Sequence, residues 1–492
     1  MEPEEIEAEE PLAKKKKETT SAARLYSEAK KLCTVWKSMG SEFYVDISWG
    51  TQRRTVPLPS SKFEAWLRQL FNYVSEGDVP TDNIIQRVIS MLVSDASFVS
   101  SRQEAFVRVG SHGGNIYIDR ATEEQGFIKV SPEGWEIVGE APIKFVRTDD
   151  VQSLPIPERS SQSLRELIRP FLSVKNDNEE ALLIGYLFGL LLPKGPYPVL
   201  VITGEHGAAK STTVRFLRSI VDPHTLDMRE PFKDVRDFTA AVRNSYCLAF
   251  DNVSYVSNWL SDSLCALATG TRALGGRALY TNSDESAFRA MRPILCNGIP
   301  DFIRKPDLVD RIIKVDLKRI KEYISDEEYW EKFEEKRAEI LGALLDCIVV
   351  GLRTRATQEV PSSIRMVHFT RWVCACEEQA GFPKGTFVGA LLANKKDSNA
   401  SVVEFSPLGI ALTGLLEDEK VFYGSYAELK TKILKYTNNP KKIPETTQGI
   451  AAELKNITES LTSMGILVKY HGRTNEKGER RGQTIVEILK NA

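Results

Sequence analysis

The sequence has no C-x-x-C pair, which argues against a structural zinc site. Its seven cysteines are scattered, and only Cys374 and Cys376 lie close together. The five histidines do not gather near them. Structural zinc needs four ligands, which usually come as closely spaced pairs. We therefore expect reduced thiols and a cytoplasmic protein.

The sequence also lacks an apolar run long enough to cross a bilayer. The longest run, ALLIGYLFGLLLP at 181–193, has 13 residues, whereas a membrane-spanning helix needs about 20. The start of the chain is acidic and has no apolar core, which is unlike a signal peptide. We expect a buried helix at 181–192 and no membrane partner.

No large excess of charge is present either. The formal net charge is −2 over 492 residues, so any contact with nucleic acid must come from local basic faces. Hydrophobic residues make up 42% and charged residues 27%, which is typical of packed globular domains. The length suggests about three domains of roughly 150 residues each.

Changes in composition, charge and hydrophobic periodicity along the chain predict a multidomain α/β protein. Residues 1–24 begin with acids, followed by four lysines, and read as a disordered, solvated tail. Residues 25–155 are expected to form a mixed α+β domain, with helical spacing at 22–36 and 60–74. Short alternating runs that favour antiparallel strands follow at 105–110, 114–120 and 134–139.

A Pro/Ser-rich linker at 154–163 precedes the remaining domains. We expect a nucleotide-binding core at 156–322 and a helical region at 323–405. Residues 406–492 show helices followed by two strand-like runs around a basic turn. That order is the outline of a winged helix.

One stretch, TGEHGAAKSTT at 203–213, departs by one residue from the phosphate-loop pattern G-x-x-x-x-G-K-[ST]. Gly204, Lys210 and Ser211 match the pattern, and Ala209 replaces its second glycine. In such loops backbone N–H groups surround the phosphates, the lysine adds charge and the hydroxyl binds Mg²⁺. The methyl group of Ala209 is tolerable where its φ is negative. A turn without function is the alternative for the motif alone.

The surrounding sequence favours a working site for ATP and Mg²⁺. An apolar strand-like run, VLVIT, leads into the loop, and a helical pattern follows it. The expected nucleotide contacts are Gly204, Glu205, His206, Gly207, Ala208, Ala209, Lys210, Ser211 and Thr212.

Three residues farther along the chain are suited to catalysis. Asp251 ends a second apolar run, where Mg²⁺ needs a further anchor beside Ser211. Asn297 ends a third and is suited to orienting water or touching the γ-phosphate. Arg311 precedes a fourth apolar run. Its charge is suited to stabilising the phosphoryl group that is transferred in the site of a neighbouring subunit. The alternative is that Asp251 and Asn297 are ordinary strand-end residues.

A catalytic base is missing from its usual place. Such ATPases commonly place a glutamate beside the metal-binding aspartate to activate water, and here that neighbour is Asn252. Asp251 itself or Glu205 remains as a candidate.

Several segments together resemble a known family. GPYPVLVITGEHGAAKSTTVRFLRSIVDP, LAFDNVSYVSNWLSDSLCALATG and RPILCNGIPDFIRKPDLVDRIIKVDL are similar to the helicase-type ATPase of phage, plasmid and integrative-element primase–helicases. That family is similar to superfamily 3 helicases of the AAA+ class. The resemblance extends from about residue 40 to the C-terminus. The Ala-Lys-Ser ending also resembles minichromosome maintenance helicases, so Ala209 does not disqualify the loop.

The resemblance implies an AAA+ P-loop ATPase core and a hexameric DNA helicase or translocase that serves a mobile element or phage. It places an arginine finger at Arg311 and a sensor asparagine at Asn297. Residues 25–155 lack the room and the acidic cluster of a primase or polymerase module, so we expect that activity in a separate partner.

Two regions are expected to bind single-stranded or forked DNA. The resemblance implies a pore hairpin at 277–290, where Arg277, Tyr280 and Arg289 are candidates, although a plain surface hairpin is the alternative. From Lys420 onward there are 13 Lys/Arg against 7 Glu, and phosphate contacts supply most non-specific affinity. The predicted wing carries Arg473, Lys477, Arg480 and Arg481, but a winged helix can also dock protein.

Two other functions fit the same sequence. The first is an ATPase that remodels or senses nucleic acid without unwinding it, in regulation or defence. The second is a DNA-binding initiator that assembles with ATP and hydrolyses little of it.

Overall fold

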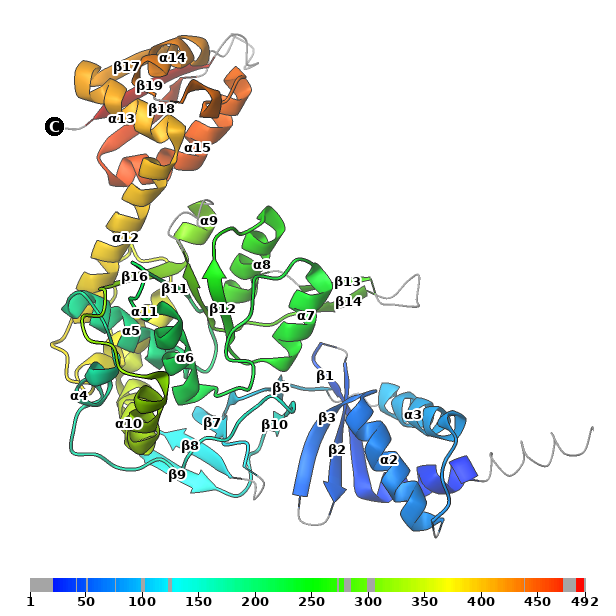
Figure 1. The fold of residues 1–492 in the computed structure, drawn as a ribbon. Helices are drawn as coiled ribbons and strands as arrows, with labels where there is room; N and C mark the ends of the chain where they lie inside the picture. The colour runs from blue at the N-terminus through cyan, green and yellow to red at the C-terminus, as the bar shows by residue number, and fades with distance from the viewer. Residues whose placement is uncertain are drawn as a thin grey trace, which may run out of the picture.

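The computed structural model shows a multidomain α/β protein (Figure 1). It describes residues 21–40, 42–49, 52–75, 77–98, 102–122, 126–271, 274–277, 285–298, 306–437, 439–471 and 484–490.

The N-terminal region is a small sheet that shares one core with a helix at 21–32 and two longer helices. The strand order is β3-β2-β1-β4, with β1 at Cys33–Ser38, β2 at Phe43–Trp49, β3 at Gln52–Leu58 and β4 at Arg102–Gln103. The helices are α2 at Ser61–Val74 and α3 at Asp82–Ser97. Ser60 caps α2 by accepting a hydrogen bond from the backbone N of Phe63, so the helix predicted at 60–74 is confirmed.

The expectation of one helix over 22–36 was wrong in its second half. Residues 21–32 are helical, but Cys33–Ser38 forms β1 and pairs antiparallel with β2. Thr34, Val35 and Trp36 favour a strand because they are β-branched or aromatic. The pairing with β2 overrides the helical spacing of the preceding turn.

Next comes an antiparallel meander, as the alternating runs predicted. Its order is β6-β7-β8-β9, with β6 at Val109–His112, β7 at Asn115–Asp119, β8 at Phe127–Ser131 and β9 at Gly134–Val138. A short parallel pair lies beside it, with β5 at Ala105–Phe106 and β10 at Lys144–Phe145. The meander shares a buried cluster with the helices of the central region.

The centre of the molecule is a parallel sheet in the order β12-β15-β11-β16. The strands are β11 at Val199–Gly204, β12 at Leu248–Val253, β15 at Ile294–Gly298 and β16 at Ile312–Leu317. All four apolar runs predicted from the sequence therefore form strands of one sheet.

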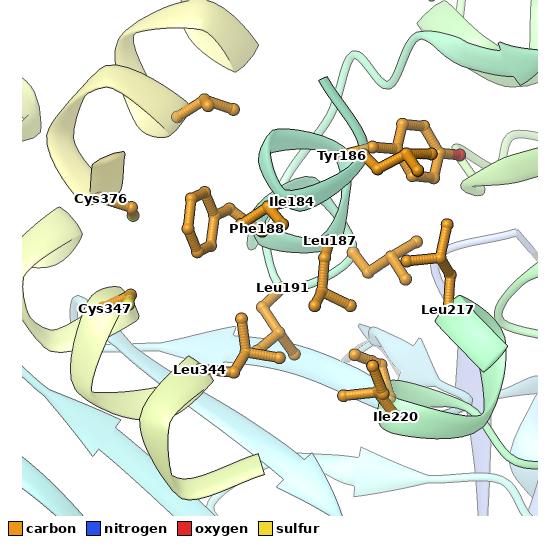
Figure 2. Packing of buried hydrophobic residues seen from close by; sticks show 14 of the residues in the cluster. Ile184, Tyr186, Leu187, Phe188, Leu191, Leu217, Ile220, Leu344, Cys347 and Cys376 are labelled. Atoms are coloured by element: carbon orange, nitrogen blue, oxygen red, sulfur yellow. The ribbon is translucent and has the colours of Figure 1, made fainter. Parts of the chain in front are cut away.

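Helices cover both faces of this sheet, because side chains alternate between them. Leu200 and Ile202 face α4 (Leu164–Ile168), α5 (Asp177–Gly189), α6 (Lys210–Val221) and α10 (Asp326–Thr354). Val199 and Val201 face α7 (Val235–Asn244) and α8 (Asn258–Thr269). Figure 2 shows Leu187 of α5 and Leu191, which follows α5, in the same buried cluster as Leu217 of α6.

Polar side chains from α12 and α5 cover the outer edge of β16 by bonding to its backbone. Asn394 accepts from the backbone N of Lys314 and donates to its carbonyl. Glu179 accepts from the backbone N of Asp316. An edge strand left bare would expose unpaired backbone groups.

A helical region leads to the C-terminal part. It consists of α10, α11 at Val367–Glu377 and the long α12 at Thr386–Phe405 (Figure 1). Beyond it lie α13 at Pro407–Glu419, β17 at Val421–Ser425, α14 at Tyr426–Ile433, α15 at Thr447–Ser463, β18 at Ile466–His471 and β19 at Ile485–Lys490. The strand order is β17-β19-β18, so the two expected C-terminal strands pair, and β17 adds a third.

Within the described ranges, no single helix is long and apolar enough to span a membrane. The bent pair α12 and α13 passes that test together by length and composition. Its apolar side chains, such as Leu408 and Leu412, are buried within the protein.

A buried ion pair ties the meander to the central sheet. Arg108 Nε donates to Asp222 Oδ1 at 3.1 Å, and both side chains are almost fully buried. Arg108 also donates to the carbonyl of Asp119 in β7. The other oxygen of Asp222 accepts from the backbone N of Cys247, just before β12. Arg108 thus connects three elements that are distant in sequence.

Replacing Arg108 with methionine is expected to destabilise the protein, because the buried Asp222 would lose its partner at 3.1 Å and keep only Arg218, whose terminal nitrogen is 3.7 Å from the other carboxylate oxygen. Since one cation remains, we expect a loss of about 3 kcal/mol, the lower end for breaking a buried pair, measured by urea unfolding followed by tryptophan fluorescence. The control is Lys332→Met, which breaks an exposed pair with Glu328 and should change little. Equal midpoints for the two variants would contradict the role given to Arg108.

Candidate functional site

The loop after β11 has the backbone shape of a ligand-binding turn. β11 ends at Gly204, and α6 begins at Lys210. Gly204 and Gly207 have φ of 147° and 78°, values that glycine adopts readily. A Cβ on Gly204 would lie 2.8 Å from the carbonyl oxygen of Leu317. The strand, loop and helix predicted at 199–221 are therefore present in that order.

Ala209 does not have the negative φ at which its methyl group would be tolerable. Its φ is 53° and its ψ is 36°, the left-handed conformation, and it forms the N-cap of α6. Its carbonyl must accept from the backbone N and Oγ1 of Thr213 to start the helix. A Cβ in this conformation costs about 1–2 kcal/mol. The alanine therefore carries strain that glycine, the usual residue of the motif, would not.

Three predicted residues meet at the carboxyl ends of the parallel strands. Ser211 Oγ donates to Asp251 Oδ1 at 2.8 Å. Asn297 Nδ2 donates to the same oxygen at 2.8 Å and lies 3.3 Å from Ser211 Oγ. Asn297 is 2% exposed. Residues from α6, β12 and β15 thus form one hydrogen-bonded group.

Asn252 occupies the position where such ATPases commonly place a catalytic glutamate. Here its backbone makes a contact within the sheet. Its backbone N donates to Asn297 Oδ1 at 2.8 Å, and its φ is 49°. The register between β12 and β15 is irregular at this point. This irregular part of β12 carries the Asp251 carboxylate that accepts from Ser211.

The remaining loop residues surround this group. Lys210 Nζ donates to the carbonyls of Gly204 and Glu205 at 2.9 and 3.0 Å. Glu205, His206 and Gly207 are exposed, Ala208 is buried, and Thr212 lies half-buried in the first turn of α6. Glu205 is the second candidate base named from the sequence.

The donor set at this edge fits Mg²⁺. The Ser211 hydroxyl and the Asp251 carboxylate are oxygen ligands, and Mg²⁺ commonly takes one or two protein ligands together with substrate phosphates and waters. No group of three or more His, Cys, Asp or Glu side chains positioned for a metal occurs among the residues described. Additional ligands would therefore come from the nucleotide and water.

Arg311 lies at the opposite edge of the sheet. Its carbonyl accepts from the backbone N of Val199, at the start of β11, whereas the loop follows the end of that strand. Six strand residues span roughly 20 Å. The guanidinium of Arg311 cannot reach Ser211 of its own chain.

The Arg311 guanidinium donates to the carboxylate and carbonyl oxygens of Asp307. Burial acts to raise the pKa of Asp307, but the hydrogen bond and charge of Arg311 outweigh it and lower the pKa. The arginine thus remains paired within its own chain.

One neighbour of the loop was missed by the sequence reasoning. The backbone N of Ile320 donates to the carbonyl of Gly207 at 3.1 Å. Tyr323, which is 65% exposed, places its hydroxyl against Gly207. The pairing of β16 with β11 puts the segment after β16 beside the loop after β11. The sequence did not reveal that β16 pairs with β11, so it could not place Tyr323 beside the loop.

The candidate DNA contacts are only partly described. Arg277 ends β13 (Leu274–Arg277), which pairs antiparallel with β14 (Glu285–Phe288). Arg289 follows β14 and is exposed. The candidates outside the described residues are Tyr280, Arg473, Lys477, Arg480 and Arg481.

The central part of the chain is similar to a known family of replication proteins. Residues 166–396 match the family model of the actinomycete integrative conjugative element replication protein. That match covers slightly less than half of the chain and includes the loop, Asp251, Asn297 and Arg311. The comparison with curated protein sequences gave no match.

Two solved structures are similar over most of their length. The SCCmec type IV Cch active helicase is 11% identical, with 93% of each chain covered and a TM-score of 0.45. The apo C-terminal region of NrS-1 is 13% identical, with 95% of this chain and 98% of that chain covered and a TM-score of 0.40. Both likenesses are too distant to transfer a function.

Replacing Ala209 with glycine should stabilise the protein by about 1 kcal/mol, because the left-handed conformation then carries no Cβ strain. Urea unfolding measures the change. The matched control, Ala452→Gly on the exposed face of α15, should destabilise by about 1 kcal/mol. The same sign for both variants would contradict the strain assigned to Ala209.

Proposed function

We propose that this chain is an AAA+ ATPase of the superfamily 3 type that forms a hexameric ring and couples ATP hydrolysis to DNA unwinding or translocation. The observation that carries the proposal is the meeting of Ser211, Asp251 and Asn297 beside the Lys210 loop. The match to replication proteins of integrative conjugative elements supports a role in copying a mobile element.

Each residue of the group has a distinct role in this proposal. Ser211 and Asp251 would hold Mg²⁺, which neutralises phosphate charge during phosphoryl transfer. Lys210 exchanges its contacts with the loop carbonyls for the β- and γ-phosphates. The backbone N–H groups of the loop and the start of α6 bind the phosphate oxygens.

The buried amide of Asn297 acts as a positioning group. It fixes the Asp251 carboxylate through one hydrogen bond and the irregular backbone of β12 at Asn252 through another. Because Asn252 has no basic side chain, Asp251 or Glu205 accepts the proton of the attacking water. We assign that role to Asp251, because it lies beside Ser211 whereas Glu205 is exposed.

The opposite placement of Arg311 supports a ring. Within one chain this arginine is about a strand length from the phosphate loop. In a head-to-tail ring each subunit presents such an edge to its neighbour. Arg311 would then leave Asp307 and reach the phosphates bound by the adjacent subunit.

The C-terminal part is proposed to be a winged helix that binds DNA. α14, α15 and the β18–β19 pair follow in the order of that fold. Lys430 lies on α14, and Lys441 and Lys442 lie on a short 3-10 helix at Pro440–Lys442, in a segment with a surplus of six positive charges. Such charges favour phosphate contacts.

A second candidate is an initiator that assembles with ATP and hydrolyses it slowly. The observation that favours it is the residue after Asp251 in the sequence, which is the amide Asn252 rather than a second carboxylate. An amide cannot accept a proton from the attacking water, so hydrolysis would be slow. Ring formation with ATP and negligible phosphate release would select this function over the helicase.

The Lys210→Ala protein should lose ATP turnover and strand separation by at least about 100-fold, because the charge on the transferring phosphoryl group is no longer stabilised. The assay follows separation of a fluorescently labelled forked duplex and phosphate release in parallel. Lys332→Ala, a change on the exposed side of α10, is the control. Turnover that DNA does not stimulate, with no strand separation by the unaltered protein, would favour an ATPase that remodels or senses.

The Arg311→Ala protein should bind nucleotide almost normally and lose about 1,000-fold in kcat, as expected for an arginine that acts on a neighbouring site. Mixing it with Lys210→Ala subunits should restore part of the turnover, because those subunits still supply Arg311. Loss of nucleotide binding by the Arg311→Ala protein alone would contradict the assignment.

A further inference from the structure

A cavity of about 440 Å³ lies between the N-terminal sheet and the central sheet. Its walls come from the end of β1, the C-terminal ends of α7 and α8, the turn before β11 and the segment that follows β14. This volume lies within the range of sites for small ligands. The cavity is separate from the loop at 204–211.

The lining of the cavity is positively charged. Lys194, Arg243, Arg289 and Arg292 face it, against Glu42 and Glu104. Arg243 pairs with Glu42 at 2.8 Å, and Tyr44 donates to the same carboxylate. Glu42 is therefore already neutralised. Lys194 and Arg289 are exposed, and neither has an ion-pair partner in the part of the chain that is described.

Arg292 is the strongest sign that an anion belongs here. Its Nε and one terminal nitrogen lie 3.3 Å from the carbonyls of Val242 and Met291. Among the described residues no carboxylate is within ion-pair distance of it. Burial lowers the pKa of Arg292. Arg292 is half-buried. A partly desolvated cation without a counter-charge is unfavourable, and an anionic ligand would offset that cost.

Aromatic and apolar groups complete the walls. Tyr44, Phe106, Tyr197 and Met291 line the cavity beside the cations. A nucleotide unit of a single strand presents one phosphate charge and one flat base, and proteins bind such units with basic side chains and aromatic surfaces.

The segment that follows the hairpin β13–β14 lines the cavity. Arg289, Met291 and Arg292 follow directly after Phe288, the last residue of β14. We infer that this cavity binds one or two nucleotides of single-stranded DNA, which pass from the hairpin between the N-terminal sheet and the central sheet. The inference rests on the proposed helicase function and extends the DNA contact expected at the hairpin, which includes Arg289, into this cavity.

The test combines photo-crosslinking with charge reversal in the full-length protein. An oligo(dT) with one 4-thiothymidine should crosslink to peptides that contain Tyr44, Phe106 or Met291. The double variant Lys194→Glu/Arg289→Glu should bind that oligonucleotide at least tenfold more weakly. Its log Kd against log[salt] slope should fall by about 1.4, since each phosphate contact contributes about 0.7.

The matched control is Lys233→Glu/Arg236→Glu, at the exposed start of α7 outside the cavity, which should leave affinity and slope unchanged. Equal affinity for the two double variants, with crosslinks elsewhere, would overturn the inference alone. If ATP abolished the crosslinks and unlabelled oligonucleotide did not, the cavity would be a site for free nucleotide and the inference would be wrong. No oligonucleotide binding by the unaltered protein would remove the proposed function as well.

Discussion

The candidate site depends on one buried side-chain amide. A buried amide must find partners for both its N–H groups and its oxygen. Asn297 finds them in Asp251, Ser211 and the backbone N of Asn252. These contacts join β15 to β12 and to the first turn of α6. The same set of hydrogen bonds that satisfies the strand end therefore also fixes the two oxygen groups suited to Mg²⁺.

The parallel sheet separates the two halves of the proposed reaction. Parallel strands bring their carboxyl ends to one edge, which is where Ser211 and Asp251 meet. Arg311 precedes β16 and so lies at the other edge, paired with Asp307. One subunit therefore holds both parts without bringing them together. On this account, nucleotide turnover depends on contact between subunits.

Much of the fold could be predicted from local patterns, and the failures have physical causes. Four buried parallel strands read as apolar runs, because both faces of their sheet are covered. The strand Cys33–Ser38 was hidden because a helical pattern leads directly into it, and only its pairing with β2 decides its structure. The left-handed Ala209 was missed because the loop closure, rather than residue type, sets its φ. Tyr323 could not be placed without the strand order, which brings β16 beside β11. The predicted domain boundaries and site roles stay predictions.

The central claim is that Ser211 and Asp251 bind a metal ion next to a triphosphate held by Lys210. The most direct measurement is a crystal structure with a non-hydrolysable ATP analogue and Mn²⁺, in which anomalous scattering locates the metal. The account predicts one Mn²⁺ peak at coordination distance from Ser211 Oγ, with Lys210 Nζ moved from the Gly204 and Glu205 carbonyls to the phosphates. A nucleotide bound elsewhere, with Lys210 still on those carbonyls, would contradict it.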